Sequence, residues 1–124
     1  MSQASKETPT SARSRKPLRF VGSALKDLRA MPDAVQDTAG RLLLDVQHGD
    51  TPPSTEPINR IGDGVVELKV DDKSGWFRFF YVAKFEDRVY VLHSFQKTTN
   101  NISQQDIDTA RKRYAAVIKA RQNP

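Results

Sequence analysis

The sequence predicts an α+β domain with a helical hairpin, a three-stranded antiparallel meander and a C-terminal helix. Three runs of alternating apolar and polar residues between Val65 and Lys97 are typical of strands, and turn-forming residues separate them. Apolar residues at helical spacing precede and follow these runs. With 124 residues, the chain is long enough for one core and too short for two domains.

Residues 1–16 are predicted to form a flexible basic arm, and residues 17–124 a single folded domain. The arm is rich in Ser, Thr, Pro and charge, and it has no apolar segment that would make it a secretory signal or part of a core. Beyond it, Leu18 to Val21 predict a short strand. Ser23 is then a candidate N-cap for a helix that extends to Met31.

A second helix is predicted to begin at Pro32, which suits a first turn because its missing amide hydrogen is not needed there. Gly49 is expected to end this helix. Its apolar stripe consists of Val35, Ala39, Leu42 and Val46. The segment 50–64 is rich in Pro, Gly and polar residues, and it predicts a loop.

The next segment predicts three strands with two unlike faces, separated by turns at 69–75 and 85–88. In the first two strands, one face carries Val66, Leu68, Val70, Phe77, Phe79, Tyr81, Ala83 and Phe85. The other face carries Glu67, Lys69, Trp76, Arg78, Phe80, Val82 and Lys84. We expect helices to cover the apolar face and to leave the second as a shallow platform that holds cations rather than acids.

The C-terminal segment predicts a long helix. Ser103 to Asp106 resembles a capping box at its start. The apolar stripe that follows consists of Ile107, Ala110, Tyr114, Val117 and Ile118. This stripe is expected to pack on the sheet or to bind a partner protein.

The composition narrows the possible functions. A net charge of +5 and a pI near 9.7 favour an anionic partner, nucleic acid first, although solubility alone accounts for the charge equally well. The absence of cysteine excludes disulfides and thiolate chemistry and suits the cytoplasm. The sequence has no glycine-rich phosphate loop, dinucleotide fingerprint or nucleophile elbow, and no run long enough to span a membrane. His48 and His93 stand far apart without carboxylates at ligand spacing, so no metal and no cofactor are predicted.

Several short motifs occur together between about residues 18 and 120. They are Leu25-x-x-Leu28-x-x-Met31-Pro32, Gln47-His48-Gly49, Val66-Glu67-Leu68, Phe77-Arg78-x-x-Tyr81, Tyr90-x-Leu92-His93-Ser94-Phe95-Gln96-Lys97 and Ile107-x-x-Ala110. In this order they resemble the RelE/HigB-like toxins of type II toxin–antitoxin systems, and most closely their phage-derived subgroup. That subgroup commonly has two adjacent lysines at the end of the fifth motif, whereas here Lys97 is followed by Thr98.

The resemblance implies a small RNase-like fold in which a helical hairpin packs on a twisted antiparallel sheet. It implies an endoribonuclease that cuts mRNA in the ribosomal decoding site without a metal. The implied partners are a helix-turn-helix antitoxin, the ribosome and mRNA, with no membrane, in the cytoplasm. The alternative is a non-catalytic RNA-binding or antitoxin-binding module on the same fold, and a third reading is a phage-derived accessory protein associated with DNA.

Cutting RNA by attack of its own 2′-hydroxyl needs a base, cations around the charged transition state and an acid for the leaving oxygen. Arg78 is the candidate phosphate clamp, and its alternative role is an ion pair with Glu67. Glu67 is either the base or the group that orients Arg78. Lys69 and Lys97 are candidates to hold phosphates or move protons, or they are solvated strand lysines. His93 is either the acid or a hydrogen-bonded residue at the edge of the core.

A second set of residues is predicted to bind RNA. It consists of Lys84, Phe95, Arg111, Lys112 and Arg113. Phe95, together with Trp76 and Phe80, is a candidate for stacking on a base, although aromatic strand residues usually belong to the core. The basic residues of the last helix also complement its dipole, so part of that run needs no ligand.

Overall fold

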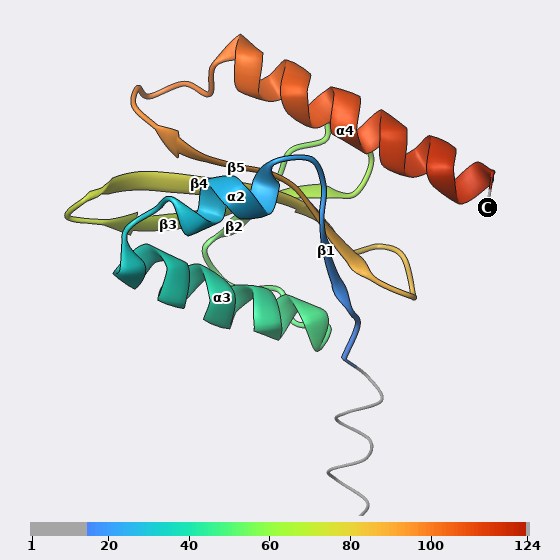
Figure 1. The fold of residues 1–124 in the computed structure, drawn as a ribbon, viewed down its shortest axis with the longest axis horizontal. Helices are drawn as coiled ribbons and strands as arrows, with labels where there is room; N and C mark the ends of the chain where they lie inside the picture. The colour runs from blue at the N-terminus through green and yellow to red at the C-terminus, as the bar shows by residue number, and fades with distance from the viewer. Residues whose placement is uncertain (1–14, 124) are drawn as a thin grey trace, which may run out of the picture.

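The computed structural model describes residues 15–123 as a five-stranded sheet with helices on both faces (Figure 1). The elements in chain order are β1 (Leu18–Phe20), α2 (Ala24–Arg29), α3 (Asp33–Gln47), β2 (Thr55–Pro57), β3 (Val65–Asp72), β4 (Gly75–Val82), β5 (Val89–Lys97) and α4 (Gln104–Gln122). The strand order is β1-β5-β4-β3-β2. Only the β1–β5 pair is parallel, so the sheet is mixed. The α+β class, the meander and the C-terminal helix are confirmed.

The turn between β3 and β4 shows why the meander was predictable from local chemistry. The carboxylate of Asp72 accepts a hydrogen bond from the backbone N–H of Ser74 at 2.7 Å. Gly75 follows with φ of 144°, a backbone conformation that residues with a Cβ rarely adopt. The pairing of Asp72 with Gly75 then sets the register of the whole hairpin, because the side chains of a strand alternate.

The segment 50–64, predicted as a loop, contains the short edge strand β2, and here the prediction was wrong. Thr55 pairs with Leu68 and Pro57 with Val66 in antiparallel register. A proline is tolerated on an edge strand because its missing N–H faces away from the partner. Three residues that include a proline show no strand periodicity, so only the pairing with β3 reveals the strand.

The helical hairpin is confirmed with two differences of detail. Ser23 precedes α2, but its hydroxyl donates to the Asp27 carboxylate at 2.8 Å rather than capping a backbone N–H. In α3 the buried stripe contains Leu43, while the predicted Leu42 is only partly buried. Both leucines are at helical spacing from Val35, so the pattern alone does not separate them.

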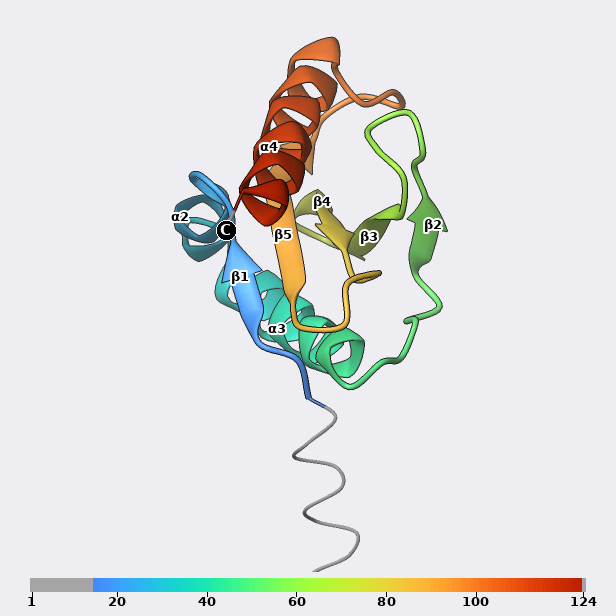
Figure 2. The same cartoon turned by 90° about the vertical axis from the view of Figure 1, so that its right-hand side faces the viewer.

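Two apolar cores lie on opposite faces of the sheet. On what we call the α2/α3 face, helices α2 and α3 pack on residues such as Leu68, Phe77 and Phe79. On the α4 face, Ile107 and Val117 of α4 pack with Phe80, Val82 and Leu92. Figure 2 shows α3 and α4 on either side of the strands. The expected open platform is therefore wrong for much of the second face, because the apolar stripe of α4 is buried against it.

The N-terminal boundary can be placed only within the described residues, and residues 1–14 of the predicted arm lie outside them. Lys16 is tied to the fold. Its Nζ donates to the carbonyl oxygens of Ala83 and Phe85, each at 2.8 Å, and its backbone N–H donates to Gln47 at 2.9 Å. Among the helices of residues 15–123, none has the length and apolar character needed to cross a membrane.

Candidate active site

The five predicted catalytic residues lie on the α4 face, in three cross-strand rows. The rows run across β3, β4 and β5 as Asp71–Trp76–Lys97, Lys69–Arg78–Phe95 and Glu67–Phe80–His93. Residues that face each other across paired strands point to the same side of a sheet, so these nine side chains share one surface. We call them the three-row site. α4 begins at Gln104 and packs mainly on Phe80, Val82 and Leu92, so the first two rows lie toward its N-terminal end.

A β-bulge in β5 brings His93 into this site. The register shifts between Phe80, which faces His93, and Tyr81, which faces Val91, so Leu92 is the extra residue. Leu92 and Tyr90 contact the core under α4, as the odd-numbered Phe95 does, whereas Val91 contacts the core under α2 and α3. A bulge reverses the alternation of a strand. Strict counting along β5 would therefore place one end of the strand on the wrong face.

Arg78 is the centre of the three-row site and is held by two carboxylates. Its side chain is 7% exposed, and its Nε lies 3.1 Å from Glu67 Oε2. This contact lacks hydrogen-bond geometry, since Nε is a buried atom without a hydrogen-bond partner. Nη1 donates to Asp71 Oδ1 at 2.5 Å and to the carbonyl of Phe77 at 3.0 Å. The ion pair with Glu67 that the sequence left open is thus present, and Asp71 is a second partner that sequence reasoning missed.

The two carboxylates do not use the whole guanidinium. Within residues 15–123, Nη2 of Arg78 donates no hydrogen bond. The fixed Nε and Nη1 contacts orient the group, because a guanidinium is planar and its donors form a rigid fork. An oriented guanidinium with one unused edge is suited to binding a phosphate oxygen.

The two lysines of the site differ in their partners. Lys69 Nζ donates to Glu56 Oε1 on β2 at 2.6 Å, and this hydrogen bond raises the pKa of Lys69. The same bond lowers the pKa of Glu56, to which the charge of Lys97 adds a smaller effect. No hydrogen bond or ion pair of Lys97 is found in the part of the chain that the structure describes. Lys97 is consequently the more available cation.

His93 is engaged through both ring nitrogens. Nε2 lies 2.7 Å from Asp106 Oδ1, and Nδ1 lies 3.4 Å from Arg113 Nη1. Arginine can only donate, so the Arg113 contact favours the tautomer in which Nδ1 accepts and Nε2–H donates to Asp106. The ring also stacks on Phe95 with centroids 4.9 Å apart. This is the hydrogen-bonded alternative for His93, and a role as acid would require one of these contacts to open.

The contacts of His93 belong to the anchoring of α4. Ser103 caps the helix by accepting from the N–H of Asp106 at 3.1 Å, as predicted, while its hydroxyl donates to Asp106 Oδ2 at 2.7 Å. Arg113 donates to the carbonyl of Leu92 and to Ser23 Oγ, both at 3.0 Å. A Cβ at Gly22 would lie 2.6 Å from Arg113 Nε, so glycine leaves room for this guanidinium. Arg113 thus joins α4 to the body of the domain.

The other predicted RNA-binding residues do not gather at one place. Lys84 lies near Tyr114, where hydrogen bonds with Asp63 and Tyr114 raise its pKa. Arg111 donates to the carbonyl of Arg60 at 2.8 Å, and Lys112 is exposed on α4. Phe95 is nearly buried and packs edge-on against Phe80. Of the predicted set, Phe95 alone belongs to the three-row site.

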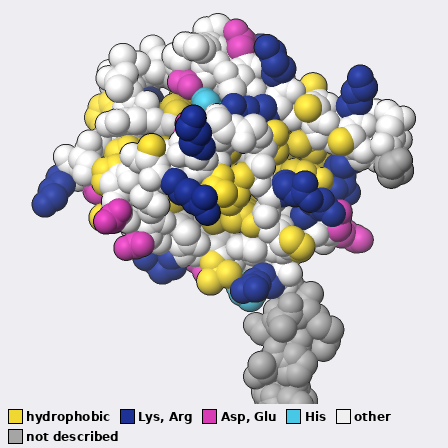
Figure 3. Space-filling view, in the orientation of Figure 1, with side chains coloured by type: hydrophobic (Ala, Val, Ile, Leu, Met, Phe, Trp, Pro, Cys, Tyr) yellow, Lys and Arg dark blue, Asp and Glu magenta, His cyan; other side chains and the backbone are white. Residues whose placement is uncertain are grey.

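A groove of about 550 Å³ lies at the far end of α4, between β1 and the C-terminal turns of the helix. Apolar side chains there adjoin basic ones on the face seen in Figure 3. Arg121 binds Asp87 at 2.9 Å and lies 4.0 Å from the ring centroid of Phe85. The hydrogen bond from Arg121 lowers the pKa of Asp87. Three distant segments build the groove, so no local motif predicts it.

Comparisons with known proteins agree with this architecture. Residues 26–115 match the family model of the phage-derived protein Gp49-like. No curated protein matches the chain in sequence. Among solved structures, the chain is similar to a doubly substituted mutant of the E. coli toxin RelE in the free state, with a TM-score of 0.58, 19% identity and coverage of 80% of this chain and 97% of that one. It is also similar to the isolated E. coli RelE toxin, with a TM-score of 0.52, 17% identity and coverage of 85% and 97%. The chain therefore belongs to the Gp49-like family of phage-derived proteins and has the fold of RelE.

Proposed function

We propose that this protein is the toxin of a type II toxin–antitoxin system, an endoribonuclease that cleaves mRNA on the ribosome. A cognate helix-turn-helix antitoxin holds it inactive, and it acts in the cytoplasm. The family and the fold support a toxin, since structures of the toxin RelE are among those similar to this chain. The observation that carries the enzymatic part is Arg78, which is oriented by Glu67 and Asp71 and whose Nη2 donates no hydrogen bond among residues 15–123.

In the proposed reaction, the 2′-hydroxyl of the RNA attacks the adjacent phosphate. Arg78 binds the phosphate oxygens on which negative charge builds up, and Lys97 neutralises the neighbouring phosphate. Glu67 removes the proton of the attacking hydroxyl, and the leaving 5′-oxygen takes a proton from Lys97, while Lys69, held protonated by Glu56, contributes positive charge. His93 acts through Asp106 by holding α4 beside the site.

The open surface of the site supports dependence on the ribosome. The pocket beside Lys97 and Phe95 has a volume of only about 120 Å³, which is small for enclosing a nucleotide chain. In the proposed mechanism, the ribosome supplies the in-line geometry, an orientation effect worth up to about 7 to 11 kcal/mol. Purified protein should cut ribosome-bound mRNA and leave naked mRNA nearly intact. Equal cleavage of the two would reject the dependence.

The decisive test is Arg78→Ala, with Arg78→Lys as the charge-conserving variant. Loss of the clamp should cost about 2 to 4 kcal/mol of transition-state stabilisation, measured as the rate of mRNA cleavage on purified ribosomes. Arg41→Ala is the control, because Arg41 is exposed on α3 and α3 packs on the opposite face of the sheet. A folded Arg78→Ala variant with full activity would remove Arg78 from the active site.

A non-catalytic RNA-binding or antitoxin-binding module is the second candidate. Two observations favour it. Glu67 and Asp71 already neutralise the charge of Arg78, and both ring nitrogens of His93 are engaged in contacts within the protein. Such a module would bind ribosomes or an antitoxin, but its induced expression would leave growth and mRNA unaffected. Growth arrest rescued by a neighbouring helix-turn-helix protein supports the toxin instead.

A further inference from the structure

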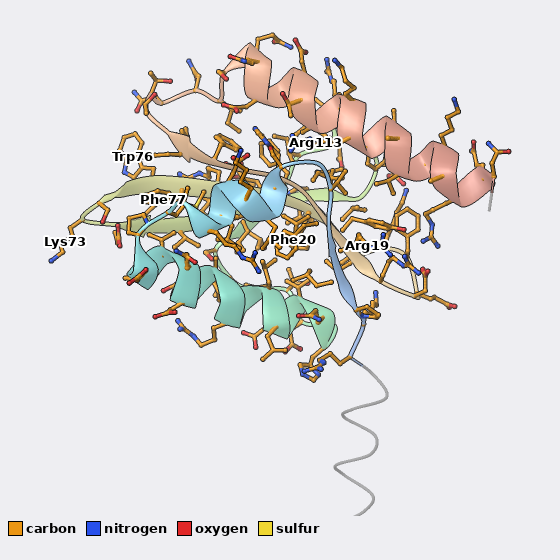
Figure 4. The ribbon with its side chains drawn as sticks, in the orientation of Figure 1. Arg19, Phe20, Lys73, Trp76, Phe77 and Arg113 are labelled. Carbon is orange, nitrogen blue, oxygen red and sulfur yellow. The ribbon has the colours of Figure 1, made fainter. Side chains whose placement is uncertain are left out.

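Trp76 differs from every other aromatic residue of β4. It is 43% exposed, whereas Phe77, Phe79, Phe80 and Tyr81 are all buried. β4 lies between β3 and β5, so this exposed ring sits on a central strand rather than at an edge of the sheet. Figure 4 shows Trp76 at the end of β4 that lies away from the C-terminal half of α4. The indole therefore offers a flat apolar surface on the same face as Arg78.

The neighbours of Trp76 are polar or cationic. Lys97 faces it across β5, and Asp71 faces it across β3. The carboxylate of Asp71 is already paired with Arg78 and does not neutralise Lys97. The ammonium group of Lys97 is therefore the positive charge beside the indole. Gln96, next to Lys97, donates to the carbonyl of Ser74 at 3.4 Å. An isolated ring in polar surroundings does not provide the continuous apolar surface that a peptide helix or a protein core would need.

Arg78 lies two residues from Trp76 on the same face, which separates their Cα atoms by about 6.6 Å along the strand. A nucleotide pairs a flat base with a phosphate over a similar span. Aromatic rings on an exposed sheet, flanked by cations, are a common means of binding unpaired bases. Phe95 cannot fill this role, because it is nearly buried and stacks on His93.

We propose that Trp76 and Lys97 form a subsite for single-stranded RNA, in which the indole stacks on an unpaired base and Lys97 binds a phosphate of the same nucleotide. This inference rests on the proposed function and deepens it by assigning a base-binding residue next to the phosphate held by Arg78. Every base has a π face, so the subsite accepts all four bases.

Trp76 is the single tryptophan of the chain, so intrinsic fluorescence reports on this subsite alone. The probe is a 2′-O-methyl adenosine hexanucleotide, which lacks the attacking hydroxyl and stays intact. Its binding, followed in parallel by the anisotropy of a labelled copy at low salt, should quench Trp76 in a saturable way. An abasic hexamer with the same phosphates is the control and should leave the fluorescence unchanged.

Three variants sharpen the test. Trp76→Ala should bind the hexanucleotide about tenfold more weakly, and Trp76→Phe should fall between Trp76→Ala and the parent protein. Lys97→Met should weaken binding by a similar factor while the quenching at saturation is retained. Thermal melts of the Trp76 variants should match the parent, since the ring is largely exposed.

The outcomes separate the subsite from the catalytic proposal. Absence of hexanucleotide binding, binding without quenching, or an unchanged affinity of Trp76→Ala would each overturn the subsite. Quenching by RNA in a protein that never cleaves ribosome-bound mRNA would keep the subsite and reject the enzyme. In an active enzyme, Trp76→Ala should raise KM and largely spare kcat, whereas Arg78→Ala should lower kcat.

Discussion

The two faces of the sheet use neighbouring residues of the same strands for different purposes. On the α2/α3 face, Phe77 and Phe79 of β4 are buried under the helical hairpin. On the α4 face, Trp76 and Arg78 alternate with them and carry an exposed ring and a bound guanidinium. One strand thus contributes to stability with one set of side chains and to the candidate chemistry with the other. Substitutions on the two faces should separate these contributions.

The α4 face itself changes character along its length. The row of Glu67, Phe80 and His93 forms the border, because Phe80 is fully buried in the core under α4 while the two polar residues beside it belong to the site. The charged rows therefore rest on packed aromatic rings. Damage to this core should also disturb the site, whereas damage to the α2/α3 core should not.

The largest effect should come from removing α4, residues 103–124. The truncation exposes Phe80 and Leu92 and loses the burial of Ile107 and Val117, worth about 1.5 to 3 kcal/mol each. Domains of this size are stabilised by only about 5 to 15 kcal/mol, so the remainder should unfold or aggregate. Deletion of residues 1–14 is the control and should change the free energy of unfolding by less than about 0.5 kcal/mol. Thermal melts of both deletion variants measure these effects. A protein that lacks residues 103–124 and melts like the parent would contradict the role of α4.

The next largest effect is expected from substitutions of the adjacent residues Phe79 and Phe80. Both are fully buried, Phe79 on the α2/α3 face and Phe80 on the α4 face. Alanine at either position should cost about 3 to 5 kcal/mol in urea unfolding. The milder Phe79→Leu and Phe80→Leu variants should stay folded, and their cleavage rates should differ. Only Phe80→Leu is expected to slow cleavage, because Phe80 contacts Phe95 and faces Glu67 and His93. Equal slowing by both variants would mean that the two faces are not separable.

A smaller difference is expected between the two carboxylates that hold Arg78. Glu67 is buried and Asp71 is half exposed. Glu67→Gln should lower the free energy of unfolding by about 3 kcal/mol, because it leaves a buried guanidinium with less compensation. Asp71→Asn should cost less than about 1 kcal/mol, since solvent screens this pair. Chemical denaturation measures both values, and a larger cost for Asp71→Asn would reverse the assignment.

The smallest effect concerns pH and the Lys69–Glu56 pair. The hydrogen bond from Lys69 lowers the pKa of Glu56 below its ordinary value. A carboxylate with a lowered folded-state pKa contributes stability above its unfolded pKa, and that contribution disappears as the pH falls through the folded pKa. NMR titration should show Glu56 titrating below the usual range of a glutamate, and Lys69→Met should move its midpoint upward. An unmoved midpoint would mean that Lys69 is not its partner in solution.

The local features of the fold can be read from the amino-acid sequence. Alternation in β3 and β4 placed Glu67, Lys69 and Arg78 on one face, and the turn chemistry at Asp72 and Gly75 defined their hairpin. Helical spacing and Ser103 located α4. These features follow from the alternation of side chains along a strand, from the periodicity of a helix and from contacts between residues close in the chain. They can therefore be predicted before the fold is known.

The way in which these elements meet depends on the folded arrangement of the whole domain. It added β2, buried the second face under α4 and used the bulge at Leu92 to align His93 with Arg78. It also supplied the partners Asp71 and Asp106, and it gave Arg113 the hydrogen bonds that anchor α4. Such contacts depend on strand order, register and helix placement, which are set by burial across the whole chain rather than by any local pattern.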